Sequence, residues 1–229
     1  MSMDRVARFI ESRTAAALWI DAPPGTGKTT TVIDTLSASK RIRAMRRIIC
    51  YRGMRIEEAL YWLNDFLLQA GIEDLDKVLG QRSRLEAKLS VLVNILAMHP
   101  VAVFFDDFHH LAIGEDDDSR VSLKNFVSAC SSLEKSAPGM LIFTSSEPPP
   151  AGAGIERVEL PGLSLAEARE FWTLLATGSA VPRDISNPLL LRLLARMSSS
   201  VTGRTELERQ RENGDRKSTR LNSSHSETS

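Results

Sequence analysis

A glycine-rich segment near the N-terminus constrains the fold more than any other feature of the chain. It reads Ala-Pro-Pro-Gly-Thr-Gly-Lys-Thr from Ala22 to Thr29 and follows an apolar stretch, Ala15–Asp21, that predicts a buried strand. The pattern of Gly27–Ala38 predicts a helix directly after it. A strand, a tight loop of small residues and a helix that opens with Lys-Thr place backbone N–H groups around phosphate oxygens. The sequence therefore predicts a phosphate-binding loop (P-loop), with alanine in place of its first glycine.

The loop also supplies side chains for a bound nucleotide. We expect Lys28 to contact the β- and γ-phosphate oxygens and the Thr29 hydroxyl to ligate Mg²⁺. A plain glycine turn before a helix is the alternative, and the adjacent Lys-Thr argues against it. The residues expected to contact the nucleotide here are Ala22, Pro23, Pro24, Gly25, Thr26, Gly27, Lys28, Thr29 and Thr30.

A second acidic motif follows the most apolar strand. Val101–Phe105 is apolar at every position, as a parallel strand covered on both faces should be, and Asp106 and Asp107 come next. We expect this strand to lie next to the P-loop strand, so that Asp106 holds Mg²⁺ together with Thr29. Asp107 is the candidate that orients or deprotonates the attacking water, which makes it, with Lys28, the expected catalytic pair. An acidic turn is the alternative, and the accompanying P-loop favours the site.

Further strands and helices alternate along residues 1–160. This alternation predicts an α/β fold with a five-stranded parallel sheet flanked by helices. The other expected strands are Arg47–Tyr51, Met140–Thr144 and Arg157–Leu160, and the other expected helices are Ile56–Ala70, Leu85–Met98 and one around Val121–Leu133.

The fourth strand ends in Thr144-Ser145-Ser146. Ligands of open α/β sheets bind at the carboxyl ends of strands, so a polar side chain there would face the γ-phosphate or the lytic water. We take Ser145 as a nucleotide contact. The alternative is an ordinary serine-rich exit from the strand.

After Pro161 the pattern becomes purely helical. Ser164 with Glu167 predicts a capping box that opens a helix to Leu175, and Asn187-Pro188 opens another that runs to Met197. Residues 161–200 are therefore expected to begin a helical lid domain.

Residues 204–229 carry no apolar period. Asp215–His225 resembles the in-frame translation of a common sequencing adapter, and we exclude it from the fold as a scar. A disordered tail rich in serine and arginine is the alternative. We expect the natural protein to continue beyond this point.

Composition narrows the classes of partner. Twenty-nine basic side chains balance twenty-nine acidic ones, which gives no general attraction to nucleic acid or anionic membrane. Two isolated cysteines, Cys50 and Cys130, suit a reducing cytosol, and no apolar run approaches the roughly 18 residues of a membrane span. We expect a cytoplasmic protein without membrane contact. The basic cluster is more simply a solvated face than a nucleic-acid or partner surface; it comprises Lys40, Arg41, Arg43, Arg46 and Arg47.

His109-His110 invites a metal interpretation. Neighbouring side chains cannot easily share one ion, and no cysteine stands at ligand spacing, so a zinc site is not expected there.

Together these motifs resemble the STAND class of P-loop NTPases, AAA+-related ATPases of the additional-strand type that include NB-ARC proteins and large ATP-binding regulators of the LuxR type. Four segments between Ala15 and Met197 carry the resemblance: APPGTGKTT, VAVFFDDFHHL, RVELPGLSLAEAREFW and SNPLLLRLLA. The resemblance implies that Pro188 lies near the adenine. This chain departs from the family in having Ser186-Asn187-Pro188 for Gly-x-Pro and Thr144-Ser145-Ser146 where many relatives place an arginine.

The resemblance implies a signalling switch that binds ATP or ADP with Mg²⁺, hydrolyses ATP slowly and self-associates on binding ATP. It would be the NTPase module of a transcriptional regulator, with protein partners bound through further C-terminal regions. The alternatives are an AAA+ motor or loader acting on DNA and a nucleotide-binding scaffold that does not hydrolyse. A kinase of small substrates fits less well, because a helical segment follows the fifth strand.

Overall fold

A parallel sheet forms the centre of the N-terminal part of the chain. The computed structural model describes residues 2–81, 83–113, 117–149, 154–175 and 185–197. Within them, five strands form one sheet in the order β2-β3-β4-β1-β5, which confirms the predicted α/β fold. The strands are β1 (Ala17–Asp21), β2 (Ala44–Ile49), β3 (Val101–Asp106), β4 (Met140–Ser145) and β5 (Ile155–Glu159).

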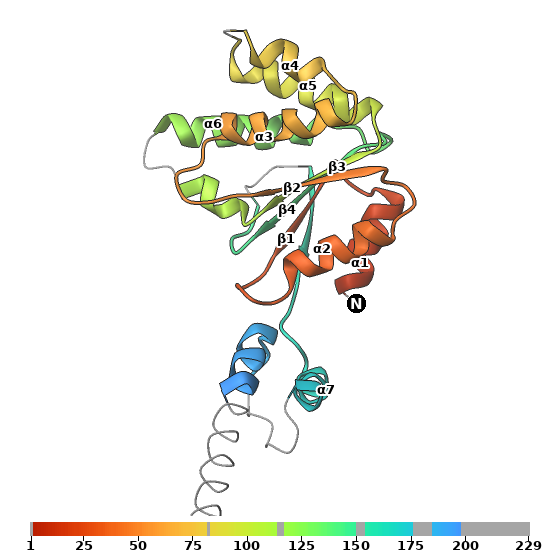
Figure 1. Cartoon of the computed structure of the whole chain (residues 1–229), viewed down its shortest axis with the longest axis vertical. Coiled ribbons are helices and arrows are strands. Elements are labelled where there is room, and N and C mark those ends of the chain that lie inside the picture. Colours follow the sequence, from red (N-terminus) through yellow and green to blue (C-terminus); the bar gives the residue numbers. More distant parts are fainter. Residues whose placement is uncertain (1, 82, 114–116, 150–153, 176–184, 198–229) are drawn as a thin grey trace, which may run out of the picture. The chain divides into compact units, whose positions relative to one another are not determined.

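Helices cover both faces of this sheet (Figure 1). On one face lie α1 (Ser2–Ser12) and α2 (Lys28–Ala38); on the other lie α3 (Ile56–Gln69), α5 (Leu85–Met98) and α6 (Asp117–Ser131). The short helices α4 (Asp74–Leu79) and η1 (Phe108–Ile113) complete this part. The sequence did not predict α1, α4 or η1. In α1, three buried side chains, Val6, Phe9 and Ile10, supply the apolar face.

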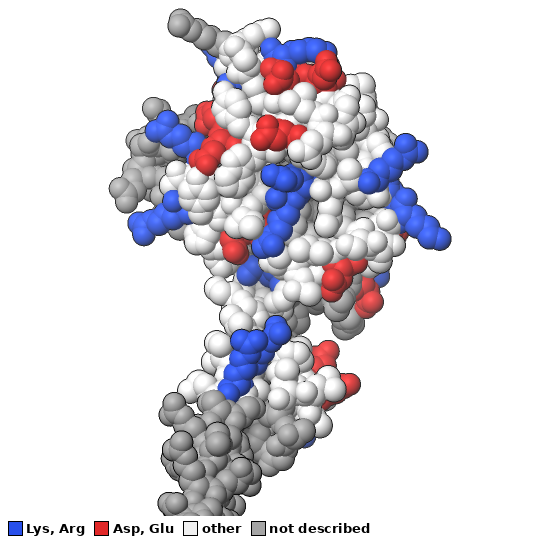
Figure 2. All heavy atoms as spheres, viewed as in Figure 1, with Lys and Arg blue, Asp and Glu red and all other residues white. Residues whose placement is uncertain are grey.

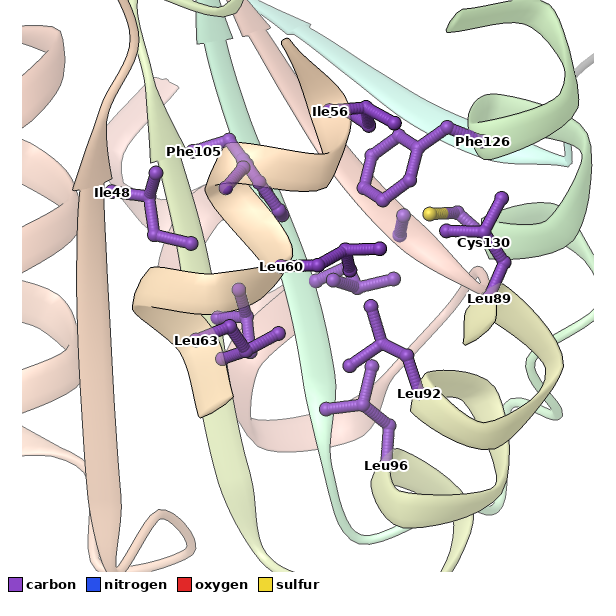
Figure 3. Packing of buried hydrophobic residues seen from close by; sticks show 14 of the residues in the cluster. Ile48, Ile56, Leu60, Leu63, Leu89, Leu92, Leu96, Phe105, Phe126 and Cys130 are labelled. Carbon is purple, nitrogen blue, oxygen red and sulfur yellow. The ribbon is translucent and has the colours of Figure 1, made fainter. Parts of the chain in front are cut away.

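The face under α3, α5 and α6 holds the larger core. Figure 3 shows Leu60 and Leu63 of α3, Leu92 of α5 and Phe126 of α6 converging beside Phe105 of β3. Burial of each such side chain contributes about 1.5–3 kcal/mol. This packing fixes the end of β3, and with it the two aspartates that follow Phe105.

The strand order corrects one expectation. We expected β3 directly beside the P-loop strand β1, but β4 lies between them and pairs with both. Apolar strand composition predicts burial and carries no information about the order of neighbours. A consequence is that β4 ends between the P-loop and Asp106, so the last residues of β4 enter the site.

The extent of β2 differs from the prediction as well. The sequence predicts a strand over Arg47–Tyr51, whereas β2 spans Ala44–Ile49 and so begins and ends earlier. β2 is an edge strand, and its neighbouring side chains differ in burial: Ile48 is buried on one face, whereas Met45 and Ile49 on the other face are 37% and 53% exposed. Charged residues are common on edge strands because they discourage pairing with other chains. Arg47 belongs to the same face as Met45 and Ile49, by the two-residue period of a strand.

The chain divides into two compact units at Pro161–Gly162. In the second unit, α7 (Leu165–Leu175) and a helix over 188–197 pack through Ala168, Trp172, Leu191 and Ala195. The predicted capping box is present: the Ser164 N–H donates to the Glu167 carboxylate at 2.8 Å, and the Glu167 N–H donates to Ser164 Oγ at 3.3 Å.

The adapter-like segment 215–225 lies outside the described residues. Among the helices that the structure describes, none combines the length and hydropathy that a membrane crossing needs.

Candidate functional site

The predicted P-loop joins β1 to α2. Gly25 and Gly27 have φ angles of 79° and 93°, in the left-handed region that side-chain-bearing residues rarely adopt. These two glycines therefore allow the loop to bend back toward the helix. The first turn of α2 begins at Lys28, and the Thr31 N–H makes the first helical hydrogen bond, to the Gly27 carbonyl at 2.9 Å, so the N–H groups of the residues before Thr31 have no partner within the helix. This is the usual setting of an anion site at a helix N-terminus.

Lys28 is buried within the loop. Its Nζ donates to the carbonyl oxygens of Ala22 at 2.7 Å and Pro23 at 3.2 Å. Burial lowers the pKa of Lys28, and the carboxylates of Asp107, Asp106 and Asp21 oppose that shift. The ammonium group is thus held by neutral carbonyl acceptors that a phosphate can replace, while the nearby carboxylates favour its charged form.

Thr29 and Asp106 meet across the site. Thr29 Oγ1 donates to the two carboxylate oxygens of Asp106, at 2.9 Å and 3.0 Å, although the residues are 77 positions apart. Asp106 is 1% exposed. A hydroxyl and a carboxylate oxygen are the hard donors that Mg²⁺ takes, and the two groups lie close enough to share one ion. The residues present therefore fit the Mg²⁺ ion that the sequence predicts.

The structure adds Arg47 to this site. Its Nε and Nη2 donate to Asp106 Oδ2 at 2.9 Å and 2.5 Å. The sequence placed Arg47 in a solvated basic cluster. No local pattern could have identified its partner, because the contact depends on β2 lying beside β3.

Thr144 is a second residue that the sequence analysis missed. Its hydroxyl donates to Asp106 Oδ1 at 2.5 Å and accepts the Asp107 N–H at 3.1 Å. The neighbouring candidate, Ser145, is buried beside the start of the P-loop, where its carbonyl accepts the Ala22 N–H at 3.1 Å. Its hydroxyl accepts the Glu147 N–H at 2.9 Å. The Thr144 hydroxyl, rather than that of Ser145, thus lies among the acidic residues.

Asp107 follows the last residue of β3 in a left-handed conformation, with φ 56°. Of the three carboxylates that act on Lys28, it has the largest electrostatic effect on the lysine pKa. His109 is nearby: its Nδ1 accepts the Ser146 N–H at 3.3 Å, and burial lowers its pKa. Aspartate is among the few residues other than glycine that adopt this left-handed conformation readily.

The other residues expected to contact the nucleotide are exposed, bonded within the loop or part of the second unit. Pro23, Pro24 and Thr30 are exposed, and Thr26 Oγ1 donates to the Pro23 carbonyl at 2.8 Å. Pro188 belongs to the second unit, so its place near the adenine stays a prediction.

Known structures share the fold of this chain, although no family model and no curated protein matches its sequence. A Walker-type ATPase of Pyrococcus abyssi superposes with a TM-score of 0.56 at 18% identity, over 95% of this chain and 76% of that one. A signal transduction ATPase with numerous domains (STAND), with a tetratricopeptide repeat sensor, from Pyrococcus horikoshii gives 0.54 at 16% identity. That match covers 84% of this chain and 27% of the STAND protein. The chain therefore has the fold of the P-loop ATPases.

Proposed function

We propose that this chain is the ATP-binding and slowly ATP-hydrolysing module of a regulatory switch of the STAND type. The observation that carries the proposal is the meeting of Thr29 and Asp106, at 2.9 Å and 3.0 Å, beside the buried ammonium group of Lys28. A hydroxyl, a carboxylate and an ammonium group at a left-handed glycine loop match the needs of a nucleoside triphosphate with its metal ion.

Each residue has a defined role in the proposal. Lys28 exchanges the carbonyls of Ala22 and Pro23 for the β- and γ-phosphate oxygens. Thr29 and Asp106 would hold Mg²⁺, which neutralises phosphate charge and orients the γ-phosphate. Asp107 orients a water molecule for attack on that phosphate and accepts its proton. Backbone N–H groups of the P-loop complete the phosphate contacts.

The regulatory part of the proposal concerns the second unit. Residues 1–160 would form the NTPase domain and residues 161–200 the start of a lid. A nucleotide shifts a lid only by its different affinity for the lid's two positions, which here would depend on the γ-phosphate and Mg²⁺. The STAND protein that shares the fold supports this proposal, and its sensor repeats are a property of that protein. We propose a cytoplasmic protein that self-associates when ATP binds and acts on other proteins through further regions.

A motor acting on DNA has less support. Figure 2 shows basic and acidic side chains interspersed on the visible face. Within the basic cluster, Arg41 donates to the Glu11 carbonyl at 2.9 Å and Arg47 is bound to Asp106. These arginines already have partners within the fold, which favours the switch.

Lys28→Ala is expected to weaken binding of Mg²⁺-ATP about 10- to 100-fold, because it removes a charge-assisted contact to the phosphates. Isothermal titration calorimetry measures the change. Lys40→Ala, at an exposed position just beyond α2, is the matched control and should bind as the wild type does. Equal affinity in Lys28→Ala and the wild type would contradict the proposed site.

The switch predicts a second result. The purified protein should retain ADP through gel filtration, and its turnover should be slow and unchanged by DNA, because a switch persists in one nucleotide state. Chromatography of the denatured protein measures the bound nucleotide. Rapid turnover that DNA stimulates would support the motor instead.

A further inference from the structure

Arg47 has a position that the proposed function leaves unexplained. It lies on the edge strand β2, two residues before Ile49, and Ile49 is the residue paired with Asp106. Its side chain therefore extends toward the carboxyl end of the sheet, where Nε and Nη2 both reach Asp106 Oδ2. Contact through two guanidinium nitrogens fixes the orientation of the group as well as its distance.

Asp106 needs such a partner when the site holds no metal ion. The residue is 1% exposed, and a buried carboxylate is costly unless hydrogen bonds and an opposite charge compensate it. Thr29 and Thr144 supply hydrogen bonds from neutral hydroxyls. Lys28 donates to the loop carbonyls instead, so the cation bonded directly to Asp106 is Arg47.

We propose that Arg47 is a built-in competitor of Mg²⁺: its guanidinium holds Asp106 while the metal is absent and must leave when the metal–nucleotide complex binds. The inference rests on the proposed nucleotide site. Thr29 Oγ1 and the guanidinium approach the same oxygen, Oδ2, so a divalent cation shared by Thr29 and Asp106 would lie close to a positive charge. Like charges at short range repel strongly where little water screens them.

The face of β2 that carries Arg47 is open to solvent. Arg47 is 38% exposed in its side chain, and its neighbours on the same face, Met45 and Ile49, are 37% and 53% exposed. The guanidinium can therefore turn from Asp106 into water without crossing the core. The free-energy cost of separating the Arg47 guanidinium from Asp106 therefore sets the Mg²⁺ concentration at which the metal ion occupies the site.

This competition predicts that Arg47 favours nucleotide binding without metal and opposes the binding of Mg²⁺. Without metal, Arg47 offsets the negative charge of Asp106 and so favours the approach of a polyphosphate. With metal, the same contact opposes occupation of the site by Mg²⁺. An arginine that binds phosphate directly would instead favour the nucleotide under both conditions.

The test is Arg47→Met, which keeps an unbranched side chain of roughly the length of the arginine stem and removes the charge. Affinity for a fluorescent, non-hydrolysable ATP analogue is measured in EDTA and across a Mg²⁺ titration. In EDTA the variant should bind the analogue about tenfold more weakly than the wild type. In the titration, its half-maximal Mg²⁺ concentration should be about tenfold lower.

Arg46→Met is the matched control, because Arg46 is exposed on the same strand with its side chain on the opposite face. It should change neither measurement. Arg47→Lys, which keeps the charge and loses the two-point contact, should retain most of the affinity in EDTA. Thermal unfolding without ligand checks that each variant folds, and Arg47→Gln replaces the methionine variant should that one fail.

Weaker binding of the analogue in EDTA together with a higher half-maximal Mg²⁺ concentration would overturn the inference in favour of a phosphate contact. Unchanged values under both conditions would overturn it in favour of a simple ion pair. Either result leaves the nucleotide site intact as long as binding by the wild type depends on Lys28. Binding that is indifferent to Lys28→Ala would instead overturn the proposed function.

Discussion

Asp107→Asn is expected to slow ATP hydrolysis about 100-fold or more while leaving ATP affinity nearly unchanged. An amide cannot accept the proton of an attacking water, and general bases contribute about 10²- to 10⁴-fold to such reactions. Asparagine is also among the few residues that tolerate the left-handed conformation found here, with φ 56°. The backbone N–H that donates to Thr144 is retained. Single-turnover hydrolysis and calorimetric binding, both with Mg²⁺-ATP, separate the two quantities.

The comparison needs a control for the loss of one acidic charge. Asp34→Asn serves, because Asp34 is exposed on α2, the helix that also carries Lys28. It should hydrolyse ATP at the wild-type rate. Wild-type turnover in Asp107→Asn would remove Asp107 from its role. A wild-type protein that binds ATP and never turns it over would favour the nucleotide-binding scaffold.

The parts of the site that the sequence predicted are local ones. The P-loop is a continuous segment in which two glycines, Gly25 and Gly27, adopt the left-handed angles that their spacing suggests. Asp106 ends a strand that is buried at every residue. The unbroken apolar run before Asp106 predicts that burial from the sequence. Where the chain's own neighbours determine the conformation, pattern and structure agree.

The parts that the sequence missed depend on distant segments. Arg47 reaches Asp106 across 59 residues and Thr144 reaches it across 38. Both contacts follow from the strand order, since β2 and β4 lie on either side of β3. A cluster of basic residues on an edge strand has the sequence pattern of a solvated face until the neighbouring strand is known. The same limit explains why β3 was placed beside β1.

Arg13→Met is expected to lower the free energy of unfolding by about 3–5 kcal/mol, through contacts far from the nucleotide site. Arg13 follows α1 and is 3% exposed, with its guanidinium donating to the carbonyls of Ala137, Gly139 and Ala16. The first two carbonyls precede β4 and the third precedes β1, so one side chain joins the starts of two central strands. Methionine fills similar volume but donates nothing, which leaves buried acceptors unpaired. Urea unfolding followed by circular dichroism measures the loss.

The surroundings of Arg13 leave little space for another donor to reach the three carbonyls in the variant. At Gly139, an added Cβ would come within 2.6 Å of the Leu96 carbonyl oxygen, so the backbone there is already packed closely against the end of α5. A water molecule cannot readily replace the guanidinium there, because the site has little space and one water cannot donate to all three carbonyls. Arg8→Met, at an exposed position of α1, is the control and should change the free energy of unfolding by less than about 0.5 kcal/mol. Equal stability of the two variants would show that the three carbonyls find other donors and that α1 is not anchored to the sheet through Arg13.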